Sequence, residues 1–158
     1  MRIGIMSDSH GNTMAVDQAI EKAGEVDLWL HAGDLIQDAE YLAMVTDKEV
    51  INVAGNCDWP QGRVPDERMI ELGGHKIFLS HGHNYGVKRG SEKFTRAAIA
   101  QGADIAVYGH SHVAEVKEQD ICLTINPGSI SYPRDGAGQS FMVLNISQNK
   151  LDVEHFHL

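Results

Sequence analysis

The chain has 158 residues and a mass of 17.3 kDa, a size that suits one hydrophobic core, and we predict that residues 1–158 form a single domain. Its composition, 42% hydrophobic and 22% charged, excludes a disordered, collagen-like or coiled-coil chain. The 13 basic and 22 acidic residues give a formal net charge of −9, which argues against a broad surface for nucleic acid or for an anionic membrane.

The sequence carries no pattern typical of export or membrane insertion. Its first five residues read as the start of a strand and have none of the features of a signal peptide. No run of about 18 apolar, uncharged residues is present to form a membrane-spanning helix. We therefore expect a cytoplasmic protein in which Cys57 and Cys122 are free thiols.

The first third of the chain alternates short apolar runs with helical patterns. Apolar runs that stop at a polar turn are typical of strands buried on both faces. Strands separated by helices predict a parallel sheet with right-handed crossovers. The expected strands are residues 2–7, 28–30 and 50–54, and the expected helices are the segment between a cap at Asn12 or Thr13 and Gly24, and residues 39–45.

The rest of the chain contains more strands than helices. Two strands around Gly73-Gly74 read as a hairpin, and the last four strands are expected to be antiparallel neighbours. Together with the first part, this predicts an α/β fold with one mixed sheet and a second, largely antiparallel sheet. The expected elements are strands 68–72 and 75–80, a helix at 91–101, a strand at 104–108, and strands 113–117, 121–125, 139–146 and 151–156.

Five of the predicted strands run into side chains that are able to bind metal. In open α/β sheets, ligands bind beyond the carboxyl ends of the strands, so we expect these five ends to meet in one crevice. The glycine before Asp34, Asn56 and His110 suits a close approach of the backbone to that crevice. The five segments are Asp8-Ser9-His10, Gly33-Asp34, Gly55-Asn56, His81-Gly82-His83 and Gly109-His110-Ser111-His112.

The donor atoms in these segments indicate a particular kind of metal site. Carboxylate and amide oxygens with imidazole nitrogens, and no thiolate, suit divalent ions such as Mn²⁺, Fe²⁺, Zn²⁺ or Ni²⁺. Seven candidate ligands exceed the needs of one tetrahedral ion but suit two ions about 3.5 to 4 Å apart, as in phosphoryl-transfer sites. Asp34, alone on the central strand, is the natural bridging carboxylate. The seven candidates are Asp8, His10, Asp34, Asn56, His81, His110 and His112.

In order, the five segments resemble the signature blocks of the calcineurin-like metallophosphoesterases. The short length and the Gly55-Asn56-Cys57-Asp58 block are most similar to the short bacterial and archaeal phosphodiesterases of the YfcE type, and Asn126-Pro127-Gly128-Ser129 resembles a later turn of that subgroup. The resemblance implies a four-layer α/β sandwich with mixed sheets and helices on the outer faces. It also implies hydrolysis of phosphodiesters by a hydroxide that bridges two metal ions.

The resemblance also implies a role for each candidate residue. Two divalent ions, Mn²⁺ first and Ni²⁺, Fe²⁺ or Zn²⁺ as alternatives, would share Asp34 as the bridging ligand. Asn56 is also placed to contact the substrate phosphate. The first ion would take Asp8, His10 and His112 as ligands, and the second ion would take Asn56, His81 and His110.

Cys57 departs from the pattern of the larger phosphatases, which have a histidine after the Gly-Asn pair. A thiol with an ordinary pKa near 8.5 is a poor acid for an alkoxide leaving group. We therefore expect activity to favour acidic, for example aryl, leaving groups. His83 is a candidate donor of the missing proton, although the spacing does not require that role. For Asp58, orienting a neighbouring ligand and having no role in the site are equally open alternatives.

Two other functions stay open: a catalytically weak or inactive scaffold on the same fold, and a phosphomonoesterase. The expected partner is a small anionic phosphodiester, without extended nucleic acid or membrane, and an exposed edge strand near the C-terminus is compatible with a homodimer or homotetramer. The basic residues in expected loops have two alternative roles, a solvated surface position or a contact with a substrate phosphate; they are Lys88, Arg89 and Arg134. No role is assigned to His31, His75, His155 or His157.

Overall fold

The computed structural model describes residues 1–59, 63–148 and 150–158. In the described part of the chain, no helix is long and apolar enough to cross a membrane. The elements, in chain order, are β1 (Arg2–Met6), α1 (Thr13–Ala23), β2 (Leu28–His31), α2 (Ile36–Thr46), β3 (Glu49–Asn52), β4 (Glu67–Leu72), β5 (His75–Ser80), the 3₁₀ turns η1 (His83–Tyr85) and η2 (Val87–Arg89), α3 (Glu92–Ala100), β6 (Ile105–Val107), β7 (Ala114–Gln119), β8 (Cys122–Pro127), β9 (Ser140–Ser147) and β10 (Lys150–His157).

The strands form two five-stranded sheets, with the orders β10-β9-β1-β2-β3 and β4-β5-β6-β8-β7. The predicted parallel pairing of the first three strands is confirmed, because β1 pairs with β2 and β2 with β3 in parallel. The prediction that the second half forms its own, largely antiparallel sheet is wrong in two respects. The strands β9 and β10 join the first sheet instead, and β5, β6 and β8 are parallel neighbours in the second sheet.

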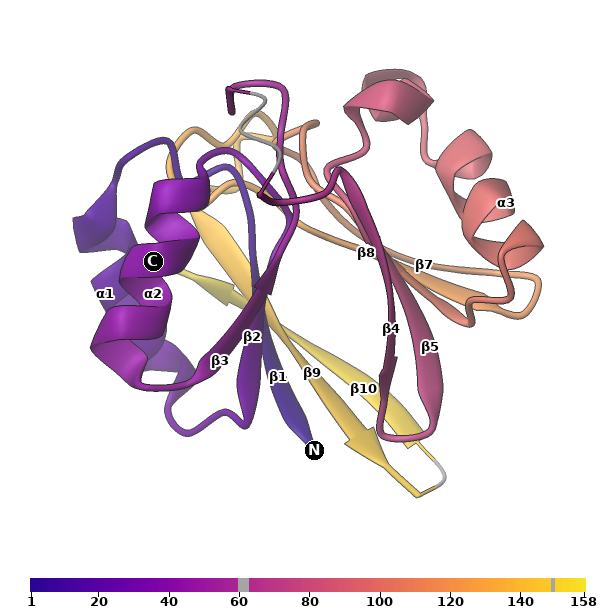
Figure 1. Ribbon diagram of the computed structural model, residues 1–158, viewed down its shortest axis with the longest axis horizontal. Helices are drawn as coiled ribbons and strands as arrows, with labels where there is room; N and C mark the ends of the chain where they lie inside the picture. Colours follow the sequence, from indigo (N-terminus) through magenta and orange to yellow (C-terminus); the bar gives the residue numbers. More distant parts are fainter. Residues whose placement is uncertain (60–62, 149) are drawn as a thin grey trace.

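The sheets face each other between two outer layers of helices. Helices α1 and α2 cover the outer face of the first sheet, and α3 covers the outer face of the second (Figure 1). Side chains from the inner faces of both sheets form one continuous core between them, for example Ile5, Leu30, Ile77 and Val107. The expected four-layer α/β arrangement with mixed sheets and outer helices is therefore confirmed.

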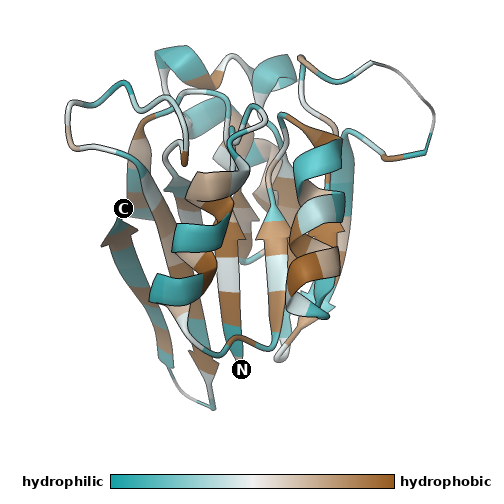
Figure 2. Cartoon of the chain, turned by 90° about the vertical axis from the view of Figure 1, so that its left-hand side faces the viewer, coloured by the Kyte–Doolittle hydropathy of each residue, from teal (hydrophilic) through white to brown (hydrophobic). Residues whose placement is uncertain are grey.

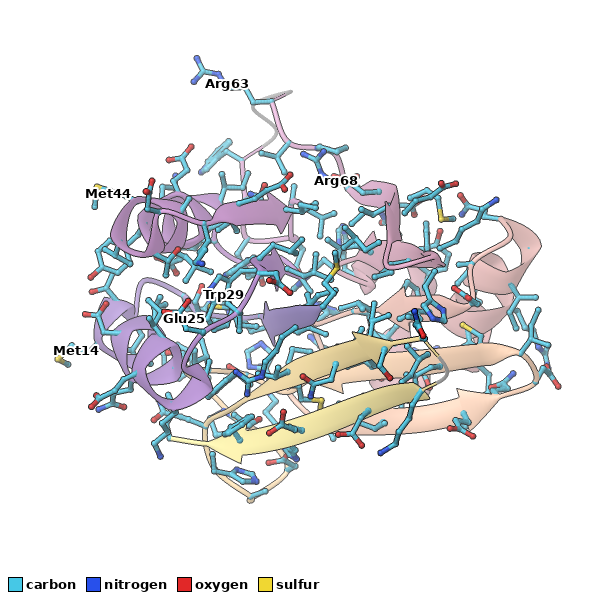
Figure 3. The ribbon with its side chains drawn as sticks, turned by 90° about the horizontal axis from the view of Figure 1, so that it is seen from below. Met14, Glu25, Trp29, Met44, Arg63 and Arg68 are labelled. Atoms are coloured by element: carbon cyan, nitrogen blue, oxygen red, sulfur yellow. The ribbon has the colours of Figure 1, made fainter. Side chains whose placement is uncertain are left out.

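The period of two along a strand explains how β2 serves two cores at once. Leu28 and Leu30 point between the sheets, whereas Trp29 points toward the helices and packs in the core under α1 and α2. Figure 3 shows Trp29 between that helical layer and the sheet, while Met14 and Met44 point outward. Figure 2 shows hydrophobic bands along the strands behind the two helices, whose outer surfaces mix hydrophilic and hydrophobic turns.

Two element boundaries differ from the predictions in ways that affect the site. The helix predicted at residues 39–45 begins at Ile36, because the Asp58 carboxylate accepts a hydrogen bond from the Ile36 N–H at 2.9 Å. This cap comes from a residue 22 positions away, so a local capping rule does not detect it. The strand predicted at residues 50–54 is β3, which starts and ends earlier, at Glu49 and Asn52.

Candidate metal centre

The seven predicted ligands all follow strands of the two sheets. Asp8 and His10 come after β1, Asp34 after β2 and Asn56 after β3, while His81 comes after β5 and the last two histidines after β6. The contacts described below bring all seven together, and β1, β2 and β3 come from one sheet while β5 and β6 come from the other. The expected convergence of the five strand ends is confirmed.

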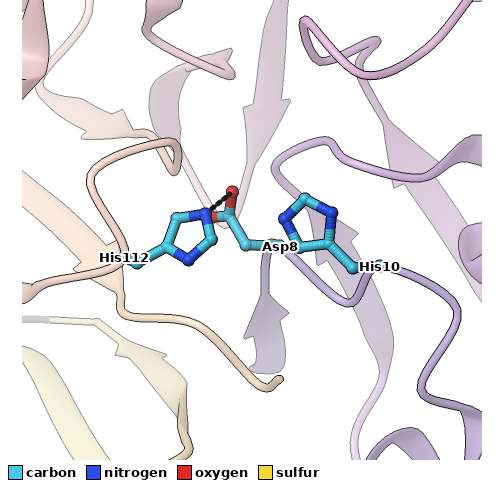
Figure 4. Close-up of side chains that lie close together, drawn as sticks. All are labelled: Asp8, His10 and His112. Carbon is cyan, nitrogen blue, oxygen red and sulfur yellow. Dashed lines mark ion pairs between the residues drawn. The ribbon is translucent and has the colours of Figure 1, made fainter. Parts of the chain in front are cut away.

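The first group consists of Asp8, His10 and His112, whose ligand atoms all lie within 4.8 Å of one another (Figure 4). The Asp8 carboxylate is fully buried, and its Oδ1 lies 3.1 Å from Nε2 of His112. The other oxygen, Oδ2, accepts hydrogen bonds from the Ser7 hydroxyl at 2.6 Å and from the His110 backbone N–H at 3.0 Å. Asp8 Oδ1, in contrast, has no hydrogen-bond partner among the residues that the structure describes.

The second group surrounds His81, which is completely buried. Its Nε2 atom lies 3.2 Å from Oδ1 of Asn56, 3.3 Å from Oδ2 of Asp34 and 3.9 Å from Oδ1 of Asp8. The His110 ring lies beside it, with ring centroids 5.0 Å apart. The same Asp34 oxygen is 3.9 Å from Nε2 of His10, so Asp34 lies between the two groups.

Hydrogen bonds at the far side of two imidazole rings determine which nitrogen faces the centre. His81 donates from Nδ1 to the Ala32 carbonyl at 2.7 Å, and His112 donates from Nδ1 to the Tyr132 carbonyl at 2.6 Å. In the neutral tautomer with a proton on Nδ1, Nε2 carries a lone pair. Both histidines thus direct Nε2 toward carboxylate oxygens, an arrangement typical of metal-binding histidines.

The charges in this cluster act strongly on its titratable groups. Burial disfavours the charged form of His81, but the hydrogen bond with Asp34 and the charges of Asp8 and Asp34 outweigh it and raise the pKa of His81. Burial also opposes ionisation of Asp34, yet the hydrogen bonds from His81 and Cys57 hold its pKa well below the usual range. The cluster of oxygens therefore attracts a positive charge at the position that faces His81 Nε2.

The pKa values of three groups next to this cluster are also shifted. Burial, followed by the positive charges of His81 and Lys88, lowers the pKa of His110 to about 4. Burial and the nearby Asp34 carboxylate raise the pKa of the Cys57 thiol to about 11, so Cys57 stays a neutral thiol at pH 7. His83 lies at the edge of the site, where burial lowers its pKa, and its ring centroid is 5.5 Å from that of His81.

The predicted role of the glycines in these turns is confirmed. A Cβ atom added at Gly33 would lie 2.7 Å from Nδ1 of His81, and one added at Gly55 would overlap the Asp34 carboxylate. One added at Gly109 would overlap the Ser7 hydroxyl. Any larger residue at these positions would push the candidate ligands apart.

The structure also reveals supporting residues that the sequence alone did not assign. His31 is buried, accepts the Gly33 N–H at Nδ1 (3.3 Å), and contacts the Ser9 hydroxyl through Nε2 (3.0 Å). Ser129, in the turn that the resemblance singled out, donates its hydroxyl to the Asp8 carbonyl at 2.9 Å. A lone buried histidine carries no sequence signal, whereas the turn around Ser129 does.

The remaining histidines lie away from the cluster. His75 pairs with Asp104 at 2.8 Å, at the opposite ends of β5 and β6. His155 and His157 alternate along β10 with ring centroids 4.4 Å apart, and both are exposed.

Comparison with known proteins gives a consistent result. The profile of the calcineurin-like phosphoesterase superfamily domain matches residues 1–149. The chain is 35% identical over 158 residues to YsnB, a probable metallophosphoesterase of Bacillus subtilis (strain 168), covering 99% of this chain and 90% of the relative. It is 31% identical over 149 residues to a phosphodiesterase of Methanocaldococcus jannaschii, covering 81% of this chain and 83% of that protein. The crystal structure of a "predicted phosphoesterase" from Streptococcus pneumoniae TIGR4 superposes with a TM-score of 0.83 at 32% identity, covering 99% of this chain and 88% of the other.

Proposed function

Since the chain belongs to the calcineurin-like phosphoesterase superfamily, we propose that it is a divalent-metal-dependent phosphodiesterase that hydrolyses small anionic phosphodiesters. One observation carries most of the argument: Nε2 of His81 faces oxygens of Asn56, Asp34 and Asp8 while Nδ1 donates to a carbonyl. In the metal-free protein the raised pKa of His81 favours a proton on Nε2 that faces these oxygens, and a dication among them would take the place of that proton and satisfy all four groups.

The unpartnered polar atoms support the same fit. Asp8 Oδ1 and His10 Nε2 are buried and have no hydrogen-bond partner among the described residues. A buried polar atom without a partner destabilises the folded protein, so an ion or a water molecule is expected to contact these two atoms. Oxygen and nitrogen donors suit Mn²⁺, with Ni²⁺, Fe²⁺ and Zn²⁺ as alternatives.

The two groups of side chains suggest two ions that share one ligand. Asp8, His10 and His112 would hold one ion, and Asn56, His81 and His110 the other. Asp34 would contact both, because one of its oxygens lies between His10 and His81. When bound, a pair of divalent cations supplies a nucleophilic water at neutral pH and neutralises charge on the transferring phosphoryl group.

The chain's own proton donors limit the substrates. Cys57, with a pKa of about 11, is a weak acid, and the lowered pKa of His83 keeps that ring neutral near pH 7. Neither group protonates an alkoxide leaving group efficiently. We therefore expect the enzyme to prefer phosphodiesters whose leaving group is already a weak base, such as an aryl oxide.

A direct test combines metal analysis with turnover of bis(p-nitrophenyl) phosphate. The purified protein should bind divalent metal and hydrolyse this diester with Mn²⁺, and EDTA should abolish the activity until Mn²⁺ is restored. Asp34→Asn should lose both bound metal and turnover, whereas Asp47→Asn, the same change at an exposed position outside the site, should keep both. A protein without bound metal and without turnover above buffer would refute the enzyme and favour the scaffold, while faster turnover of p-nitrophenyl phosphate would favour a phosphomonoesterase.

A further inference from the structure

A groove lies beside the candidate metal centre, between the turns η1 and η2 and the first residues of α3. It has a volume of about 710 Å³, within the range of roughly 300 to 1,000 Å³ that is usual for small-ligand sites. In Figure 1 these turns and the start of α3 form one continuous border next to the second sheet. The side chains that line the groove include His83, Asn84, Tyr85, Arg89, Lys93 and Arg96.

The groove carries a positive charge that contrasts with the rest of the acidic chain. Lys93 and Arg96 are three positions apart on α3 and therefore share a face, opposite Arg89 of η2. Glu92, the acidic residue of the lining, is already paired with Lys117 at 2.8 Å. In the described part of the chain, Arg89, Lys93 and Arg96 form no ion pair, because no carboxylate oxygen lies within 4.0 Å of their side-chain nitrogens. Their charge is therefore available to an anionic ligand.

His83 connects the groove to the metal centre. Its ring lines the groove, and its centroid is 5.5 Å from that of His81 and 6.1 Å from that of His110. Its Nδ1 atom is buried and has no hydrogen-bond partner among the described residues. His83 therefore borders both the groove and the candidate ligands His81 and His110, so that the groove is next to the candidate metal centre.

We propose that this groove binds a second phosphate group of the substrate, so that the preferred substrates are phosphodiesters with a further phosphate on one arm. The inference rests on the proposed phosphodiesterase activity and names the substrate class for that site. Two guanidinium groups favour phosphate, because each can donate a pair of parallel hydrogen bonds to its oxygens. The concave shape and limited volume favour a small molecule over a protein surface.

The first arm of the test compares two matched substrates, the p-nitrophenyl ester of thymidine 5′-phosphate with and without a 3′-phosphate, in Mn²⁺ buffer. The 3′-phosphate should lower KM about tenfold, which corresponds to about 1.4 kcal/mol. In the Arg89→Gln/Arg96→Gln variant, KM for the two substrates should become similar, while turnover of bis(p-nitrophenyl) phosphate stays unchanged. The control Lys76→Gln/Lys150→Gln removes the same charge from exposed lysines outside the groove and should keep the tenfold difference.

The second arm needs no turnover and therefore separates this inference from the proposed activity. Calorimetric titration with Mn²⁺ present should give tighter binding of thymidine 3′,5′-bisphosphate than of thymidine 5′-monophosphate, with the difference lost in the Arg89→Gln/Arg96→Gln variant alone. If no diester is hydrolysed but this difference is found, the phosphodiesterase proposal fails and the groove assignment stands. Equal KM and equal affinity for the paired compounds in the unmodified protein, or an equal loss in the lysine control, would overturn the inference.

Discussion

Asp58 offers a sharp test of how the fold positions the candidate metal centre. Its Oδ1 accepts the Ile36 N–H at the start of α2, at 2.9 Å, and its Oδ2 accepts the Gly55 N–H at 2.8 Å. One carboxylate thus joins the segment after β2, which carries Asp34, to the turn after β3, which carries Asn56. We expect Asp58→Asn to loosen this connection and to move both candidate ligands.

The size of the effect follows from the two hydrogen bonds. A hydrogen bond to a charged group contributes about 1.5 to 3 kcal/mol, and because Asp58 is half-buried the lower value applies. Asparagine keeps one acceptor oxygen but turns an NH₂ group toward the other N–H. We therefore expect Asp58→Asn to lower the free energy of unfolding by about 1.5 to 2 kcal/mol, and the affinity for Mn²⁺ to fall about 10-fold to 100-fold, as for other residues that orient metal ligands.

Urea denaturation measures the first quantity, and titration with Mn²⁺ measures the second. Asp104→Asn is a matched control, because Asp104 also accepts two hydrogen bonds, from the Lys76 N–H and from His75, both at 2.8 Å, at the opposite ends of the strands. This control should lose stability and keep its metal affinity. Equal Mn²⁺ affinity in the two variants would refute the positioning role of Asp58.

Three further predictions address the core, the buried histidine and the missing acid. Gly4→Ala should lower the free energy of unfolding by about 1 to 3 kcal/mol in thermal denaturation, because the new methyl group would overlap the Trp29 ring. Burial lowers the pKa of His31 from 6.5 to about 4, so the folded protein keeps this ring neutral while the unfolded chain binds a proton below pH 6.5. In metal-free buffer the free energy of unfolding should therefore fall as the pH drops from 6.5 toward 4, by up to about 1.4 kcal/mol per pH unit. His31→Gln should flatten that part of the stability curve, and an unchanged slope would contradict this reasoning. Cys57→His should raise kcat for a diester with an alkyl leaving group more than for an aryl diester, and equal changes would exclude a leaving-group effect.

The location of the site could be predicted from the sequence because it depends on a simple property of the fold. Polar residues directly after strands are brought together wherever those strands end at one edge, and this does not require knowledge of the whole topology. Asp8, His10 and His112 illustrate the point, since they come from strands in different sheets yet lie within 4.8 Å of one another. The glycines before the ligands were a further reliable signal.

The parts that could not be predicted depend on contacts between distant segments. The strand β9 is buried along most of its length because it lies between β1 and β10 in the first sheet, and its apolar run would suit an inner position in either sheet. The start of α2 depends on Asp58, and the support of Gly33 depends on His31. None of these partnerships leaves a pattern in the local sequence, so periodicity and capping rules cannot identify them.

Backbone strain at the same turns indicates that the arrangement of the candidate ligands is maintained at a cost in stability. In the described part of the chain, seven residues other than glycine have positive φ angles, and five of them are candidate ligands; His10, for example, has φ 47°. The left-handed conformation costs about 1 to 2 kcal/mol for a residue with a side chain. In metal-free protein, His10→Gly should therefore be about 1 kcal/mol more stable than His10→Ala, although both lose activity. At the exposed Asp47, with φ 52°, the Gly variant should also be more stable than the Ala variant, and both should keep activity. At Glu21 within α1, the Gly variant should instead be less stable than the Ala variant. Equal stability of the two His10 variants in urea would mean that the turn relaxes without strain, and the predicted conflict between stability and metal binding at this position would be absent.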